Sequence, residues 1–402
     1  MLKDTLMLRR RRRFIMVSAT VALSLLGDSL LYAVLPARLE DFQVLVWQVG
    51  LLLGANRIIR LVTNELAGRI IRRFGPRRPL VAAVVLGSLI TAGYALPWGF
   101  WWLLAARLLW GACWSILRVE GYISALSFSD RGNRGRIFGI YQAITRTGSG
   151  GGVLVGGFLC DLWGIKPTFA LFGLLAAGGI ILAAGAPLKD DKRLEAPEVA
   201  DGGAVPHIGA PLLLWFCAFA LPMTEQMIAN LTGRLAVERI LPGMAGLPLT
   251  VGAAGLTGLL LSIRSIQTLV IGPVAGLISD RIGRKRLLGV VCAMQILLIG
   301  GLALNTAWYL IILFLLLQFA AAVSARLLIV ALAGDLAPVG DEALFMSRFS
   351  TFVDLGTALG PVAAFSLYAA WGFEYVAVLA VCLLLSVLLL LSAGGLRTMR
   401  KA

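Results

Sequence analysis

Twelve apolar segments, each long enough to cross a lipid bilayer, occur along this 402-residue chain. The hydrocarbon layer is about 30 Å thick, so a spanning helix needs about 20 predominantly apolar residues. Between most of the segments the connectors are short, which leaves little chain for any other structure. The sequence therefore predicts an all-α integral membrane protein with 12 transmembrane helices. The segments are 14–36, 47–68, 80–98, 100–125, 137–159, 167–184, 211–231, 249–278, 287–304, 308–332, 349–370 and 373–394.

The composition excludes several soluble classes of protein. Hydrophobic residues make up 59% of the chain and charged residues 14%, whereas soluble domains contain about 25% charged residues. The five cysteines are dispersed without a CxxC pair, and the one histidine, His207, lies in a polar connector. We therefore expect no catalytic residues, no metal site and no cofactor. A lipid-modifying membrane enzyme is a weaker alternative, because the chain has no HExxH motif and no acid pair at metal spacing.

The net charge of +15 is distributed unevenly across the expected membrane. With both termini placed in the cytoplasm, 25 of the 36 Lys and Arg residues fall in cytoplasmic segments, four outside and seven within spans. This bias is the positive-inside pattern that orients membrane helices, so it does not indicate a nucleic-acid surface. The run Arg9–Arg13 precedes an apolar segment too long for a signal peptide, which predicts an uncleaved first helix.

The chain contains an internal duplication at a constant offset of 208 residues. Residues 50–80 align without a gap on residues 258–288, with 14 of 31 positions identical, and the same offset carries Trp163 and Gly164 onto Trp371 and Gly372. A polar connector at 188–208 separates the two copies. We therefore expect two pseudo-symmetric six-helix bundles, residues 1–187 and 209–402, joined by a cytoplasmic linker.

A glycine-rich, basic motif recurs after the second helix of each copy. Its form G-x-x-x-D-R-x-G-R-R/K resembles the signature of the major facilitator superfamily of secondary transporters. The N-terminal copy has Arg72 in place of the motif aspartate, and Arg107-x-x-x-Gly111 is a second similarity. The resemblance implies the twelve-helix fold of that family and alternating access at a midplane site. The implied gating residues are Gly68, Arg73 and Gly75 in the first copy, and Gly276, Asp280, Arg281, Gly283 and Arg284 in the second.

Glycines gather in the fifth and eleventh expected helices, where the pattern resembles a motif that many exporters of this family carry. Small residues let helix backbones approach closely, slide or bend. We therefore expect packing faces and hinges here, and the motif favours export. The expected hinge residues are Gly148, Gly152, Gly156, Gly157, Gly356, Gly360 and Pro361.

Three of the acids within the expected spans are the candidates for proton coupling. A carboxylate at membrane depth is costly unless it is paired or faces water, and can exchange a proton as its surroundings change. Asp28 is the first candidate and Glu225 the second, since both occupy similar depths in the first helix of each copy. Asp354 occupies the repeat position of Arg146, which suggests a salt bridge between the two copies. Each acid could instead be a satisfied structural anchor.

Seven arginines within the spans outnumber the five acids there. Because arginine binds carboxylates and phosphates through two parallel hydrogen bonds, this surplus favours a substrate with an anionic group. Arg107 could alternatively be a structural tie to a buried acid, and the tryptophans could serve ordinary packing. The candidate substrate-binding residues are Arg57, Arg60, Arg107, Trp110, Trp114, Arg118, Arg146 and Arg326.

These features lead to one principal functional hypothesis and two alternatives. The principal one is a proton-coupled exporter or antiporter of a small or amphipathic organic compound, with an anionic metabolite favoured. A broad drug–proton antiporter is the alternative within the same class, and a non-transporting receptor is an alternative outside it. We expect a functional monomer in the bacterial cytoplasmic membrane, whose partners are the lipid bilayer, protons and a small-molecule substrate.

Overall fold

The computed structural model describes residues 2–96, 98–129, 134–187, 212–245, 251–336 and 342–392. Over these ranges the chain forms helices and no strand. Eight of the described helices are long and apolar enough to cross a membrane. The twelve longest helices are α1 (Leu2–Ala37), α2 (Val46–Phe74), α3 (Arg77–Gly93), α4 (Gly99–Phe128), α5 (Arg134–Trp163), α6 (Ile165–Gly185), α7 (Leu212–Leu235), α9 (Ala253–Ile282), α10 (Arg284–Leu304), α11 (Trp308–Leu336), α12 (Glu342–Trp371) and α13 (Phe373–Ser392).

Each expected segment coincides with one of these helices, although the ends differ. The largest difference is at the N-terminus, where α1 continues through the basic run that we expected to precede the membrane. Three short elements lie between the long helices. They are the 3-10 helix η1 (Glu40–Phe42), the π-helix η2 (Ala236–Ile240) and α8 (Leu241–Gly243). The polar connector at 188–208, including His207, lies outside the described residues.

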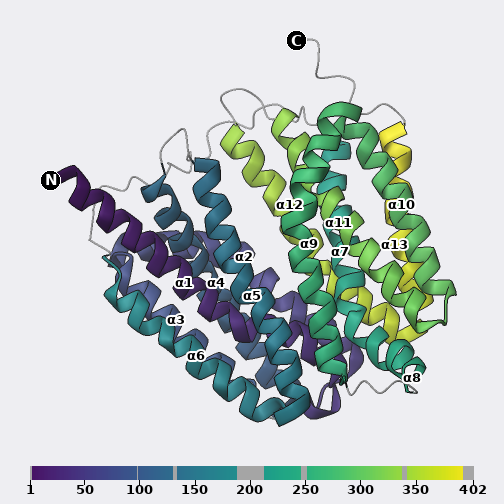
Figure 1. The fold of residues 1–402 in the computed structure, drawn as a ribbon, viewed down its shortest axis with the longest axis horizontal. Helices are drawn as coiled ribbons and strands as arrows, with labels where there is room; N and C mark the ends of the chain where they lie inside the picture. Colours follow the sequence, from purple (N-terminus) through teal and green to yellow (C-terminus); the bar gives the residue numbers. More distant parts are fainter. Residues whose placement is uncertain are drawn as a thin grey trace. The chain divides into compact units, whose positions relative to one another are not determined.

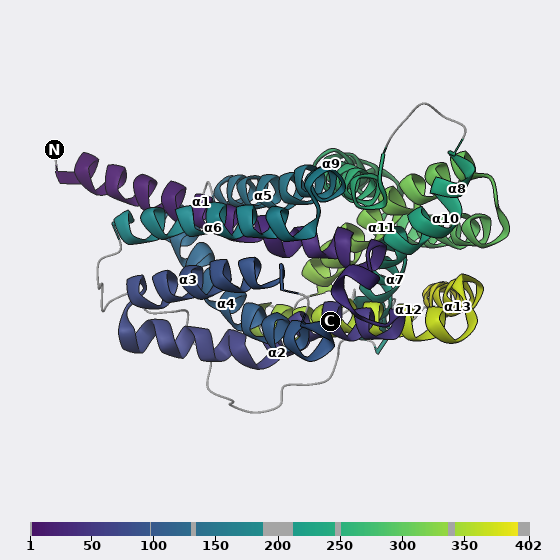
Figure 2. The same ribbon diagram turned by 90° about the horizontal axis from the view of Figure 1, so that it is seen from below.

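The chain divides into two compact units. The first contains residues 1–44, 58–195 and 250–262, and the second contains 45–57, 196–249 and 263–402. In the first unit α1 packs against α4, α5 and α6, while α3 packs against α4 and α6. Figure 1 shows α1 lying beside α6 along much of its length. The second unit repeats this arrangement, because α7 packs against α11, α12 and α13, and α10 packs against α11 and α13 (Figure 2).

The duplication is visible in the backbone at individual glycines. Gly75 and Gly283 have φ angles of 74° and 94°, and Gly164 and Gly372 have φ angles of 87° and 92°. Both pairs are separated by the repeat offset, and each ends a helix or precedes the next one. Side chains disfavour this left-handed conformation, whereas glycine adopts it freely. The repeated turns therefore explain why these glycines recur in the sequence.

The glycines of α5 and α12 allow close backbone contact within each unit. A Cβ atom on Gly148 would lie 2.2 Å from the carbonyl oxygen of Ala22 in α1, and one on Gly356 would lie 2.1 Å from that of Phe219 in α7. Such distances exclude any side chain larger than hydrogen. These positions are therefore tight helix crossings, as the small-residue pattern predicts. Whether they also act as hinges stays a prediction.

The other glycines of the pattern in α5 and α12 also lie at close contacts. A Cβ atom would meet the Leu26 carbonyl at Gly152, side chains of Leu30 and Phe172 at Gly156, the Ala254 carbonyl at Gly157 and the Met223 carbonyl at Gly360. Pro361 lies inside α12 without ending it.

Substituting Gly148 should destabilise the first unit. The Gly148→Val side chain would overlap the α1 backbone, and such overpacking typically costs about 1–3 kcal/mol. Gly151→Val is a matched control on the same helix, because a Cβ there meets nothing within 4 Å. Thermal unfolding of the two purified variants checks this, and equal melting temperatures would contradict the crossing.

Candidate functional site

The first unit holds a buried ion pair between Arg107 and Asp28, the first candidate for proton coupling. Arg107 of α4 donates a hydrogen bond through Nη1 to the Asp28 carboxylate of α1, and through Nη2 to the Tyr32 hydroxyl at 2.8 Å. The Tyr32 ring also lies under the guanidinium, at 5.0 Å from its centroid. The side chains of Arg107 and Asp28 are 0% and 7% exposed. This closed geometry matches the structural tie that we considered as an alternative for Arg107.

A second ion pair ties the same helices at another level. Arg13 of α1 donates to the Glu120 carboxylate of α4 at 2.6 Å, and both side chains are buried. Arg13 was expected in the cytoplasmic tail, but α1 extends through it and brings it against α4. Most of the buried charged side chains described in the first unit are therefore paired with each other, in two ion pairs that join α1 to α4.

The charges of the second unit are arranged differently. Glu225 of α7 is 3% exposed and accepts a hydrogen bond from Arg264 Nη2 of α9 at 2.5 Å, while Arg326 Nε of α11 lies 3.6 Å from its other oxygen. The two arginine side chains remain 21% and 26% exposed. A single carboxylate therefore lies between two guanidinium groups that are still accessible. We call Glu225, Arg264 and Arg326 the α7–α9–α11 cluster.

A third arginine lies beside this cluster. Arg57, whose segment of α2 belongs to the second unit, donates to the Gln226 side-chain oxygen at 3.3 Å and to the Thr357 carbonyl at 3.4 Å. Arg57 and Arg326 are both close enough to Arg264 to repel it electrostatically. Three guanidinium groups therefore accompany one carboxylate here, and the excess positive charge favours an anion with hydrogen-bond acceptors.

The remaining predicted binding residues belong to the first unit. Trp110 is buried and stacks on Trp114, with ring centroids 5.7 Å apart, so this pair packs within the first unit. Asp354 is half-buried, and no ion pair is recorded for it among the described residues. Its pairing with Arg146 would join the two units and stays a prediction. Arg60, Arg118 and Arg146 are half-buried within the first unit.

The gating motif is partly defined in the structure. Arg284 donates through Nη1 to the Ala331 carbonyl at 3.0 Å and forms an ion pair with Asp335 at 2.5 Å, both in the last turns of α11. A cation at a helix C-terminus is favourable because the carbonyl groups there lack partners. Arg73 and Arg281 are exposed and Gly68 has open space around it. The surroundings of Gly276 and Asp280 lie outside the described side chains.

The sequence analysis did not select two charged residues, Arg264 and Asp161, as site residues. Arg264 was counted among the intramembrane arginines but not selected, although it occupies the repeat position of Asn56 in the polar second helix. Asp161 of α5 accepts hydrogen bonds from Arg38 at 2.8 Å and from the Gly255 amide at 2.6 Å. No pattern singled it out, because its partners lie far along the chain.

Curated relatives of this chain are transporters. It is 27% identical to an uncharacterized MFS-type transporter of Yersinia enterocolitica over 70% of this chain and 72% of the relative. It is 22% identical to the multidrug resistance protein MdtG of Dickeya zeae over 81% and 79% of the two chains. A Danio rerio protein described as "Probable vesicular acetylcholine transporter-B" is 29% identical, over 47% of this chain and 41% of that protein. This chain therefore spans less than half of the zebrafish protein.

Solved structures and a family model agree on the fold. The nucleoside transporter NupG superposes with a TM-score of 0.75 at 12% identity, covering 95% of this chain and 99% of that one. A bacterial homolog of the human lysosomal transporter Spinster gives a TM-score of 0.72 at 15% identity, covering 96% and 97%. The Major Facilitator Superfamily model matches residues 17–255 and 214–398. This chain is therefore a multi-pass membrane protein that belongs to the Major Facilitator Superfamily.

Proposed function

We propose that the chain is a proton-coupled secondary transporter of a small or amphipathic organic anion, and that the α7–α9–α11 cluster binds both the anion and the proton. The observation that carries this proposal is the Glu225 carboxylate held between two arginines that remain partly exposed. A carboxylate or phosphate on the substrate would take the positions that the Glu225 oxygens now occupy.

The proposal ranks Glu225 ahead of Asp28 as the proton site, reversing the order expected from the sequence. The Asp28–Arg107 pair is shielded from solvent. Protonating Asp28 would neutralise its carboxylate and leave the Arg107 guanidinium without a counter-charge in a buried environment. The partners of Glu225 are accessible, so water and solute can replace it there. Accessibility rather than depth in the membrane distinguishes the two acids.

The electrostatics of the cluster fixes the sign of the coupling. When Glu225 is ionised, it competes with an incoming anion for Arg264 and Arg326. Protonation of Glu225 removes this competing charge, so the proton and the anion favour each other's binding. An anion should therefore move in the same direction as the proton. From the exporter-like glycines we expected exchange, in which substrate and protons move in opposite directions. Exchange would suit a cationic substrate, because a cation and a proton compete for the same carboxylate.

Binding measurements as a function of pH test this proposal. With a panel of labelled aryl carboxylates and sugar phosphates, affinity should rise as the pH falls toward values at which carboxylates are protonated. Glu65→Gln is a control that removes an exposed carboxylate in an ion pair with its helical neighbour Arg69, and it should leave the pH dependence unchanged. An affinity that falls with decreasing pH, or no binding by any anion, would contradict the proposal.

The drug–proton antiporter remains the second candidate, favoured by the similarity to MdtG and by an aromatic cavity in the second unit. In that case a lipophilic cation and a proton would compete for Glu225. The affinity for tetraphenylphosphonium would then rise with increasing pH, opposite to the behaviour of an anion. We further propose the bacterial cytoplasmic membrane, cytoplasmic termini and a functional monomer, as the loop charges and the Yersinia relatives suggest.

A further inference from the structure

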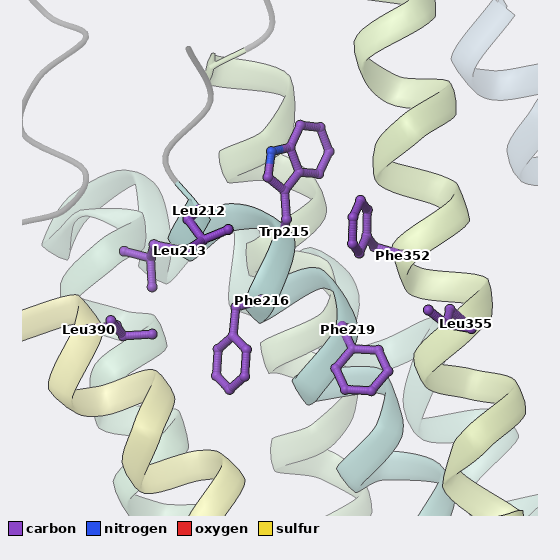
Figure 3. Close-up of a pocket in the computed structure, with 8 residues that line it drawn as sticks. All are labelled: Leu212, Leu213, Trp215, Phe216, Phe219, Phe352, Leu355 and Leu390. Carbon is purple, nitrogen blue, oxygen red and sulfur yellow. The ribbon is translucent and has the colours of Figure 1, made fainter. Parts of the chain in front are cut away.

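The second unit contains an apolar cavity away from the charged cluster. It measures about 510 Å³ and is lined by residues of α7, α12 and α13. This volume lies within the range of about 300–1,000 Å³ that is typical of small-molecule sites. In Figure 3 the Trp215 and Phe352 rings lie next to each other among the lining side chains. The lining residues are Leu212, Leu213, Trp215, Phe216, Phe219, Phe352, Leu355 and Leu390.

The packing of α7 on α12 explains why a cavity forms here. At Gly356 the two backbones approach closely, since a Cβ there would lie 2.1 Å from the Phe219 carbonyl oxygen. Toward the start of both helices, aromatic rings take the place of glycine between them. The Trp215 ring lies 5.3 Å from the centroids of both Phe345 and Phe352. The wide rings separate the helices beyond the crossing and leave space among them.

The cavity is partly open at the surface of the second unit, next to exposed apolar residues. Leu212 and Leu390 line it, and they are 84% and 41% exposed. Leu390 belongs to α13, on which exposed apolar residues such as Val378, Leu385 and Leu389 continue along the helix. A helix that exposes residues of this kind faces lipid, so acyl chains can reach the opening.

One cation lies on the cavity-lining face of α12. The helical repeat of about 3.6 residues places Arg348 between Leu355 and Phe352 on the same face. Arg348 is exposed and one turn closer to the helix start than Phe352. Asp354 lies about 120° around the helix axis from Arg348, on another face of α12, so the two side chains are not neighbours along the helix. The face therefore combines an apolar cavity with a guanidinium at one end.

We propose that this cavity holds an acyl chain of an anionic membrane phospholipid, whose phosphate group binds Arg348. The combination of aromatic lining, a lipid-facing opening and one exposed guanidinium matches a negatively charged headgroup on an apolar chain. The site is distinct from the α7–α9–α11 cluster, so it does not depend on the proposed transport activity. It would make the packing of α7 against α12 sensitive to lipid composition.

Quenching of Trp215 fluorescence by lipids with brominated acyl chains tests the proposal. The Trp215 signal is obtained in nanodiscs as the difference between the unmodified protein and Trp215→Phe. Brominated phosphatidylglycerol should quench it with about fivefold higher affinity than brominated phosphatidylcholine, since one basic residue attracts an anionic headgroup by about 1 kcal/mol. Arg348→Gln should abolish this preference, whereas Arg286→Gln, an exposed arginine on α10, should retain it.

Native mass spectrometry of the same variants gives a second measurement that does not depend on Trp215. The unmodified protein should retain phosphatidylglycerol, and Arg348→Gln should lose it while keeping its melting temperature. Equal quenching by both lipids, or no quenching by either, would overturn the proposal. Quenching only by a free brominated fatty acid would also overturn it, because the occupant would then be a mobile solute.

Discussion

The Arg107→Met variant should be strongly destabilised, by about 3–5 kcal/mol, because it leaves the Asp28 carboxylate without its partner in a dry interior. The same variant also removes the hydrogen bond that Arg107 donates to Tyr32. We expect a large fall in melting temperature and low yield of folded protein. Thermal unfolding in detergent, monitored at the buried cysteines with a thiol-reactive dye, measures the effect.

A double variant distinguishes the effect of leaving Asp28 unpaired from a general intolerance of substitution at position 107. Replacing both members, with Asp28→Leu and Arg107→Met, should recover most of the stability, since apolar pairs often replace buried ion pairs at little cost. Glu65→Gln, which breaks an exposed ion pair on α2, should cost less than about 1 kcal/mol. If Arg107→Met unfolds no earlier than Glu65→Gln, the pair is not the structural tie that its burial indicates.

The Arg326→Gln variant should lose anion affinity by about ten- to a hundredfold, the usual value of a hydrogen bond to a charged group. Glu225→Gln should have the opposite effect at neutral pH, because it imitates the protonated acid and leaves both arginines available. It should also abolish the dependence of affinity on pH. Isothermal titration of the purified variants with the anion that binds the unmodified protein gives both results.

Arg69→Gln is the matched control for the arginine substitution, since Arg69 is exposed and forms an ion pair with Glu65 of its own helix. It should bind as the unmodified protein does. A Glu225→Gln variant that still binds the anion more tightly at low pH would place the titrating group elsewhere, and Asp354 would then be the next residue to substitute.

The fold could be predicted from the sequence because it depends on features that are local or repeated. Apolar segments of spanning length predicted twelve long helices, and the constant repeat offset predicted a duplication that recurs in the backbone as positive φ angles at Gly75 and Gly283. The extension of α1 was missed for a physical reason. A run of arginines predicts an aqueous tail, but Arg13 is stabilised inside the unit by Glu120, which lies 107 residues away.

The candidate site could be predicted only in part, because it depends on pairs of side chains from distant helices. Charge at membrane depth selected both Glu225 and Arg326, which the structure places together, yet it could not separate them from Asp28 and Arg107. That difference lies in accessibility, which is set by packing. Arg264 was overlooked because no motif distinguishes it, and its role depends entirely on its contact with Glu225.

Flux in proteoliposomes under an imposed pH gradient tests the central claim most directly. Labelled organic anions should accumulate on the side toward which protons flow, and the accumulation should be lost in Arg326→Gln and become independent of the gradient in Glu225→Gln. Accumulation of a cationic dye against the flow of protons, with no movement of any anion, would contradict this account and favour a drug–proton antiporter.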